Sequence, residues 1–244
     1  MDLAKEGQHF YNRDGSPCYE IDGKKTTLRE ARKFKLYPGT TTIIAQARNF
    51  GLDAWKTDQV IMACLTMPKI EGESEQEYIK RLKEDAKEQA RKAAEKGTDI
   101  HGYVERGFRG KILPDETGYM YFDSVANTIF NECGRQEWHA EKSFASSLGY
   151  GGKCDLHNDL YLIDFKGTDK DLATIKTWEE QSMQLAAYDA GLEGFVGRKC
   201  GICYVHRDTA ESRLIWIPEK DLLKGWECFK CLLGHYFAKT GLER

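Results

Sequence analysis

The side chains best suited to chemistry lie in one short segment, residues 152–166, which holds two aspartates and a lysine. On a β-strand, residues two apart share a face, so Asp164 and Lys166 point the same way. A two-residue turn at 158–159 predicts a hairpin that brings Asp155 to this same face. Asp155 and Asp164 are then expected as diagonal neighbours, with backbones about 7–8 Å apart.

Two carboxylates at this spacing are suited to hold one divalent cation, and oxygen ligands favour Mg²⁺ or Mn²⁺ over softer metals. Such a cation lowers the pKa of bound water and acts as a Lewis acid on a phosphodiester. An ammonium at Lys166 can orient that water or stabilise the charge that develops on the phosphate. The same spacing is common on exposed strands without function. Here, however, the apolar run 160–163 leads directly into the charged pair, and buried charges need partners or a metal.

Three further positions are candidates for the same site. His101 and Glu105 are four residues apart, so they share a helix face where the histidine is a candidate metal ligand. Gln184 and Tyr188 have the same spacing and are able to hydrogen-bond a phosphate or a catalytic group. Glu141 precedes the hairpin and is a candidate for the metal pocket. Each has an ordinary alternative, as a surface residue or as the polar rim of a packed helix.

The elements that must position these residues follow from the periodicity of the chain. Strands are expected within 143–168, at 202–205 and at 214–217, with helices over 178–190 and 221–239. A capping box at Ser74 and Glu77 predicts a charged helix through Lys96, which Gly97-Thr98 interrupts before a second helix. A turn at 11–17 predicts a small N-terminal hairpin. We therefore expect a single domain over 1–244, with 1–96 as a hairpin and helical elaboration and 97–244 as an α/β core.

The bulk composition fits a soluble protein with a sizeable core. The chain has 244 residues, of which 41% are hydrophobic, and a formal net charge of −3, so it does not bind nucleic acid by bulk charge alone. Its first residues lack the apolar segment of a secretion signal, and no apolar run reaches membrane-spanning length. We expect a cytoplasmic location, and hence free thiols at the eight cysteines.

The ordered set of motifs over 97–188 resembles the RecB-type branch of the PD-(D/E)XK nucleases. The set comprises Gly97-Thr98, His101, Glu105, Glu141, Asp155, Asp164-x-Lys166 and Gln184-x-x-x-Tyr188. The segment 37–44 extends the likeness, because it is similar to a Pro-x-x-Thr-Thr-Ile-Leu element of phage-encoded exonucleases and of the mitochondrial genome-maintenance exonuclease family. Two positions depart from the pattern: Cys154 stands where a proline is expected, and Gly167 where a threonine is expected.

This resemblance implies a restriction-endonuclease-like core, with a central mixed sheet flanked by helices. It also implies a DNA exonuclease that needs Mg²⁺ or Mn²⁺ and acts on single- or double-stranded ends in phage-type recombination or DNA processing. A phage-encoded enzyme would work in the host cytoplasm, with a single-strand-binding or annealing protein as a partner. The implied roles are metal binding for His101, Asp155, Asp164 and Glu141, catalysis for Lys166, support by Gln184 and Tyr188, and phosphate contact by Thr41 and Thr42. Apart from the resemblance, Lys56 is a candidate to bind DNA phosphate and Trp55 a candidate to stack on unpaired bases, with a solvated lysine and a core aromatic as the ordinary alternatives.

Two alternatives remain open at this point. One is a non-processive endonuclease with the same site. The other is a DNA-binding protein that does not cut and holds a metal through the pairs Cys200/Cys203 and Cys228/Cys231. On a strand, Cys200 and Cys203 face opposite sides, and the second pair lies in an apolar helix pattern, so both pairs are better explained as small core residues.

Overall fold

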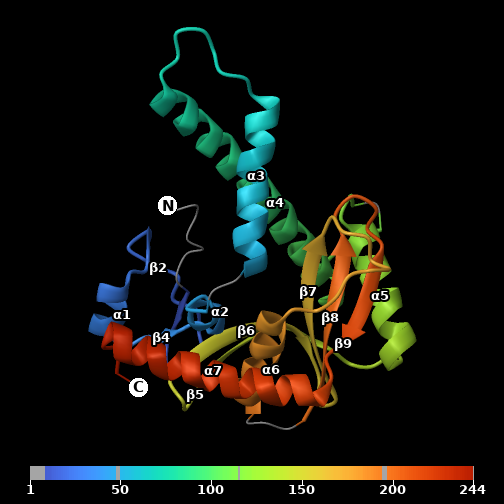
Figure 1. The fold of residues 1–244 in the computed structure, drawn as a ribbon. Helices are drawn as coiled ribbons and strands as arrows, with labels where there is room; N and C mark the ends of the chain where they lie inside the picture. Colours follow the sequence, from blue (N-terminus) through green and yellow to red (C-terminus); the bar gives the residue numbers. More distant parts are fainter. Residues whose placement is uncertain (1–8, 48–49, 115, 194–196, 244) are drawn as a thin grey trace.

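The computed structural model describes residues 9–47, 50–114, 116–193 and 197–243. At its centre is a five-stranded mixed sheet in the order β5-β6-β7-β8-β9 (Figure 1). The strands are β5 (His139–Ser146), β6 (Tyr150–His157), β7 (Tyr161–Thr168), β8 (Lys199–His206) and β9 (Ser212–Trp216). Strands β7 and β8 are parallel, and the other neighbouring pairs are antiparallel. The predicted α/β fold with a central mixed sheet flanked by helices is therefore confirmed.

Helices cover both faces of this sheet and create two hydrophobic cores. The covering helices are α6 (Glu179–Glu193) and α7 (Glu219–Thr240) on one face, and α5 (Tyr119–Cys133) with the inner part of α4 (Glu75–Phe108) on the other. The side chains of β8 alternate between the cores: Cys200, Ile202 and Tyr204 lie in the first, and Cys203 and Val205 in the second. A parallel strand pair buried on both sides explains the apolar runs in β7 and β8.

Strand β6 changes sides at its centre. Cys154 belongs to the first core and Leu156 to the second, although residues two apart on a regular strand share a face. The strand therefore turns at Asp155, which lies at the boundary between the two cores.

The N-terminal segment packs on the first core through short elements. They are β1 (Phe10–Tyr11), β2 (Glu20–Ile21), β3 (Lys24–Lys25), α1 (Leu28–Phe34), β4 (Tyr37–Pro38) and α2 (Thr40–Ile44). The expected turn at 11–17 is present, closed by a bridge between Tyr11 and Pro17, but β1 forms its main pairing with β4. A Cβ at Gly151 would lie 2.5 Å from the Tyr11 ring, so the bare backbone of β6 is what lets this segment approach.

Helices α3 (Phe50–Thr66) and α4 form a long arm that projects from the sheet (Figure 1). The predicted break at Gly97-Thr98 is wrong, because α4 runs for 34 residues without interruption. A glycine within a helix costs only about 1 kcal/mol, which packing at both ends offsets. None of the helices in the described part of the chain combines the length and apolar character that crossing a bilayer requires.

Candidate active site

The central carboxylate of the site lies on β7. Asp164 is 2% exposed, and its Oδ2 lies 2.7 Å from the ammonium of Lys166, which is on the same face of the strand. Ile163 and Phe165 point into the opposite core, as the alternation predicts. The lysine side chain is partly exposed, so this ion pair lies between the buried core and solvent.

Asp155 reaches this pair by a register that differs from the prediction. The predicted two-residue turn at 158–159 is wrong, because the turn spans Asn158–Tyr161 and the Asn158 side chain accepts hydrogen bonds from the backbone of Leu160 and Tyr161. Strands β6 and β7 pair at Leu156–Ile163 and at His157–Leu162. Extended by one step, this register sets Asp155 directly opposite Asp164 rather than diagonal to it.

Beyond the Leu156–Ile163 pair, the Asp155 side chain, rather than the β6 backbone, binds the β7 backbone. Its Oδ2 accepts a hydrogen bond of 2.8 Å from the backbone N–H of Phe165. The same oxygen lies 3.4 Å from Nδ1 of His101, which α4 carries to the site, and the His101 ring meets the Phe165 ring edge-on. The structure therefore places His101 beside Asp155, where it holds that carboxylate in position.

Gln184 and Tyr188 approach Asp164 from helix α6. The Gln184 amide donates to Asp164 Oδ1 at 2.9 Å and contacts the Tyr188 hydroxyl at 3.0 Å. Both residues are buried. They therefore lie behind the carboxylate, where they fix its orientation, and the buried position favours support of Asp164 over direct phosphate contact.

Burial and charge shift the pKa values of Asp155 and Asp164 in opposite directions. Burial, together with the charge of Asp155, raises the pKa of Asp164 to about 6, although the nearby Lys166 ammonium opposes this effect. Burial also acts to raise the pKa of Asp155, but its contacts with His101 and the charge of Lys166 outweigh it and leave the pKa below the usual value. Burial lowers and Asp155 raises the pKa of His101, and the net shift is upward. Near pH 7 the site therefore holds two adjacent ionised carboxylates, one of them ionised at an energetic cost.

Glu141 lies close to this cluster but has a partner of its own. Its carboxylate forms an ion pair with Lys153, the neighbouring lysine on β6. Burial raises the pKa of Glu141, and the charge of Asp155 adds to that shift, so the two carboxylates are near enough to repel each other. Glu105, which shares the His101 helix face, pairs with Arg109 at 2.6 Å. Sequence reasoning gave Lys153 no role, and nothing in the local pattern marks it.

The donor set fits a hard divalent cation. Within the described residues, no three His, Cys, Asp or Glu side chains are gathered closely enough to enclose a metal ion. Mg²⁺, however, typically uses one or two carboxylates and takes its remaining ligands from water and substrate phosphate. Oδ2 of Asp164 is buried and makes no hydrogen bond, having only its ion pair with Lys166. Asp155 and Asp164 are therefore the residues that would hold such an ion, with His101 at its edge.

The four residues expected to contact DNA lie apart from the carboxylates. The Thr42 hydroxyl accepts a hydrogen bond of 3.0 Å from the backbone of His9, whereas Thr41 is exposed in the first turn of α2. Trp55, which is 37% exposed, and Lys56 lie on α3 in the arm. The hydroxyl of Thr42 is thus already used within the protein. The side chains of Thr41, Trp55 and Lys56 make no hydrogen bond or ion pair with other residues in the part of the chain that the structure describes.

The cysteine pairs do not form a common site. All eight cysteines are free thiols, and Cys200 and Cys203 lie in opposite cores, as the strand pattern predicts. Cys228 packs at the edge of the first core, and Cys231 is exposed on the same helix. This arrangement gives no support to a cysteine-bound metal.

A buried ion pair near the hairpin turn was not anticipated from the sequence. Arg198 donates to Asp189 Oδ1 and to the backbone oxygen of Asn158, each at 2.8 Å. Both side chains of the pair are 2% exposed. The pair therefore ties helix α6 to the turn that sets the β6–β7 register. Arg198 is forty residues from Asn158, and no local spacing rule connects residues so far apart.

Comparisons with solved structures give distant likenesses. No protein-family profile and no curated protein matches the sequence. Among solved structures, a protein of Eubacterium rectale proposed to be an exonuclease is 14% identical, with 61% of this chain and 69% of that chain covered and a TM-score of 0.41. An alkaline exonuclease from Laribacter hongkongensis is 12% identical, with 83% and 89% covered and a TM-score of 0.44. Similarity at this level leaves the function to be decided by the chemistry of the site.

Proposed function

We propose that this chain is a metal-dependent deoxyribonuclease that hydrolyses phosphodiester bonds at DNA ends. The proposal is carried by the proximity of Asp155, whose charge acts on Asp164, and by the Lys166 ammonium 2.7 Å from Asp164. Two carboxylates and an ammonium at the edge of a buried core suit a reaction in which negative charge develops on a phosphate.

The residues divide the work according to their position. Asp155 and Asp164 would hold Mg²⁺ or Mn²⁺, which supplies an activated water and relief of phosphate charge. Lys166, the one member with a partly exposed side chain and a full positive charge, orients the water and contacts the phosphate oxygens. His101 holds Asp155, and Gln184 holds Asp164, with Tyr188 behind it, so these three act through the carboxylates.

The motif order supports a more specific assignment to the RecB-type branch of the PD-(D/E)XK nucleases. Asp155, the Asp164-x-Lys166 pair and the Gln184-x-x-x-Tyr188 pair occur in that order. Under this assignment the favoured activity is that of an exonuclease in phage-type recombination or DNA processing. Glu141 would become a further metal contact only if it exchanged its Lys153 partner for the ion.

The test is degradation of end-labelled single- and double-stranded DNA with Mg²⁺, Mn²⁺ or EDTA. Wild type should cut only with metal, and Lys166→Ala should lose that activity. Lys170→Ala is the matched control, since it removes an exposed lysine just beyond β7 and should cut normally. A covalently closed circular substrate separates the two modes, because an exonuclease leaves it intact and an endonuclease opens it. Absence of cutting by well-folded wild type would refute the proposal.

A further inference from the structure

Helix α4 links the candidate site to the projecting arm without a break. It begins at Glu75 in the arm and ends at Phe108, and it carries His101 to Asp155. In a continuous helix each residue turns by about 100° and advances about 1.5 Å. The direction in which every side chain of the arm points can therefore be stated relative to His101.

Three lysines of the arm share the face that carries His101. By this geometry Lys83 points within a few degrees of His101, Lys87 about 40° away and Lys80 about 60° away. Four glutamates, at positions 77, 84, 88 and 95, fall together about 100–140° away, and the basic residues Arg81, Arg91 and Lys92 lie on the same side of the helix. Between residues 75 and 96, the sector within about 60° of the His101 direction therefore carries lysines and no acidic side chain, although the stretch as a whole is nearly neutral.

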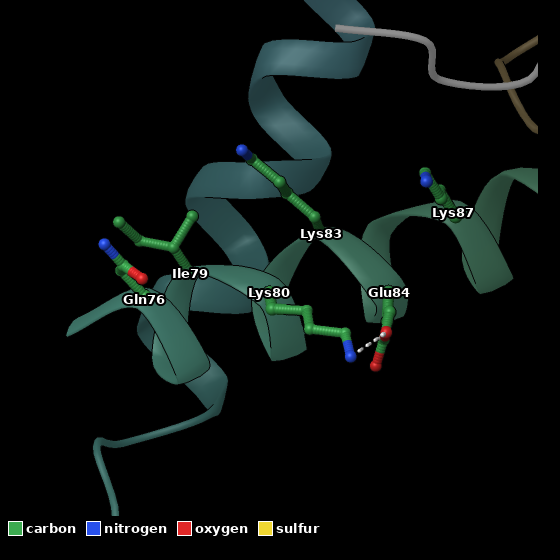
Figure 2. Close-up of a pocket in the computed structure, with 6 residues that line it drawn as sticks. All are labelled: Gln76, Ile79, Lys80, Lys83, Glu84 and Lys87. Atoms are coloured by element: carbon green, nitrogen blue, oxygen red, sulfur yellow. Dashed lines mark ion pairs between the residues drawn. The ribbon is translucent and has the colours of Figure 1, made fainter. Parts of the chain in front are cut away.

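Lys80 and Lys87 are exposed on that face, and Lys83 is half-buried. Figure 2 shows Lys83 and Lys87 rising on one side of α4, with Glu84 directed away from them; the six residues drawn line an open hollow there. Lys80 is 78% exposed and lies 3.9 Å from Glu84, a distance at which an exposed pair contributes little. Among the described residues, no ion pair joins Lys83 or Lys87 to an acidic side chain. Their charge is therefore available to an external anion.

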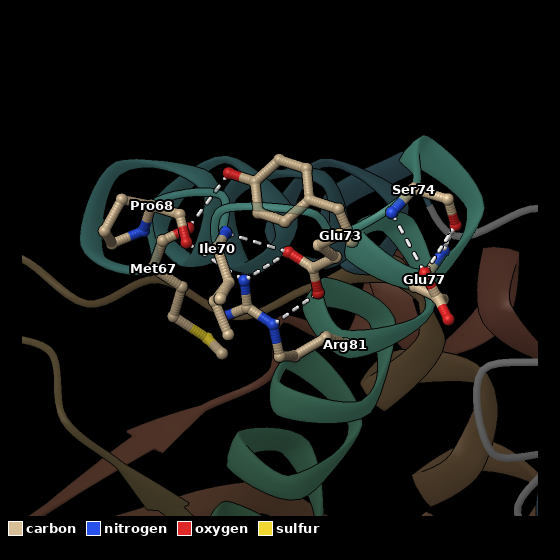
Figure 3. A network of polar contacts seen from close by, with 8 residues as sticks. Met67, Pro68, Ile70, Glu73, Ser74, Glu77 and Arg81 are labelled. Carbon is tan, nitrogen blue, oxygen red and sulfur yellow. Dashed lines mark hydrogen bonds and ion pairs between the residues drawn. The ribbon is translucent and has the colours of Figure 1, made fainter.

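The connection between α3 and α4, at the far end of the arm, is held by side-chain hydrogen bonds. Arg81 forms two hydrogen bonds with Glu73, at 3.0 and 2.9 Å, and a third with the Pro68 carbonyl. Tyr78 donates to the Met67 carbonyl at 2.9 Å, and Ser74 caps α4 (Figure 3). These contacts join the α3–α4 connection to the first turns of α4. These contacts therefore fix the end of α4 that carries the three lysines.

We propose that the arm binds the phosphate backbone of the duplex that flanks the DNA end being cut. This inference rests on the proposed function of the site. Lys87 and Lys80 are 14 and 21 residues from His101, hence about 21 and 32 Å along the helix. At about 3.4 Å for each base pair, the row contacts phosphates about six to nine base pairs from the catalytic carboxylates. Duplex DNA is stiff over this length, so a straight row of charges fits it better than a flexible single strand.

The experiment is DNA binding by fluorescence anisotropy, with the full chain in EDTA so that no cutting occurs. The variant is Lys80→Ala/Lys83→Ala/Lys87→Ala. The charge-matched control is Lys220→Ala/Lys224→Ala/Lys230→Ala, three exposed lysines on α7. The ligands are duplexes of about 20 and about five base pairs and a single strand of about 20 nucleotides, each measured over a range of salt concentrations. Circular dichroism checks that both variants are folded.

The arm variant should bind the long duplex about tenfold or more weakly at low salt. Its plot of log K against log salt should be shallower by about 2.7, the contribution of three phosphate contacts. The short duplex should bind wild type and variant alike, and the control should match wild type. An unchanged salt slope, or a loss confined to the single strand, would overturn the proposal. Because the assay needs no catalysis, lysine-dependent binding by a protein that does not cut would leave the arm in place and refute only the nuclease function.

Discussion

Replacing Asp164 by Asn should stabilise the metal-free protein while removing its activity. The carboxylate is almost fully buried, and its pKa is raised to about 6. The ordinary value is about 3.9, so keeping this group ionised in the folded state costs about 3 kcal/mol above pH 6. An Asn amide has no charge to desolvate, and its oxygen can still accept the hydrogen bond from Gln184.

The sign of the pH dependence follows from proton binding. Between about pH 4 and pH 6 the folded protein holds a proton on Asp164 that the unfolded chain has lost. Stability must therefore fall as pH rises through that window, because the unfolded state binds fewer protons. The penalty is complete above pH 6. Wild type in EDTA should lose up to about 3 kcal/mol across this range from Asp164 alone, and Asp164→Asn should lose none of it.

The measurement is urea unfolding of both proteins in EDTA at pH 8, repeated with Mg²⁺. Wild type should gain about 2.7 kcal/mol when Mg²⁺ is present at a hundred times its dissociation constant, whereas the variant should gain little. Addition of metal should thus reduce or reverse the difference in unfolding free energy between Asp164→Asn and wild type. Asp164→Asn that is less stable than wild type in EDTA at pH 8 would refute this account of the site.

Asp189→Asn provides the contrasting control. Asp189 is equally buried and ion-paired, but its partner Arg198 is itself 2% exposed, whereas Lys166 reaches solvent. Loss of the Asp189 charge would remove one partner of a buried ion pair, which costs about 3–5 kcal/mol. The same substitution should therefore stabilise at one position and strongly destabilise at the other.

Three further outcomes are expected. Gln184→Leu should lower Mg²⁺ affinity about 10- to 100-fold, measured by titration calorimetry, because Asp164 loses the donor that orients it. In EDTA, His101→Ala should destabilise the protein most below pH 6.5, where the histidine is charged in both the folded and the unfolded state. The loss of stability should shrink as the pH rises through the raised pKa of folded His101, and unfolding measured at several pH values will test this. Gly225→Ala should cost about 1–3 kcal/mol and leave specific activity unchanged, since its Cβ would lie 2.7 Å from the α6 backbone.

The alternation of residues along β7 was enough to predict which side chains share the catalytic face. Asp164 and Lys166 point one way and Phe165 the other, because side chains alternate along a strand and burial of Phe165 fixes the face on which the other two lie. The four-residue spacing likewise brought Gln184 and Tyr188 together on α6. Predictions of this kind succeed where a local period and a single buried face decide the outcome.

The turn between β6 and β7 was beyond the reach of local rules. A two-residue turn at 158–159 fits the sequence, but the Asn158 side chain accepts two backbone hydrogen bonds, and the turn is shifted by one residue to 159–160. Arg198, forty residues away, also binds the Asn158 carbonyl. A contact of such sequence separation has no local signal. The observed register, extended by one step, sets Asp155 opposite Asp164.

Tertiary packing, which no local rule predicts, also keeps α4 continuous through Gly97. Ile100 and Val104 are buried on the sheet side of Gly97, and Leu82 and Ala86 are buried in the arm where α3 packs on α4. Full burial of a single large apolar side chain contributes about 1.5–3 kcal/mol, which exceeds the cost of about 1 kcal/mol for a helical glycine. A break of one residue at Gly97 would turn the arm by about 100° and carry its lysine row away from the site. The packing that overrides the glycine is thus also what fixes the lysine row on the His101 face.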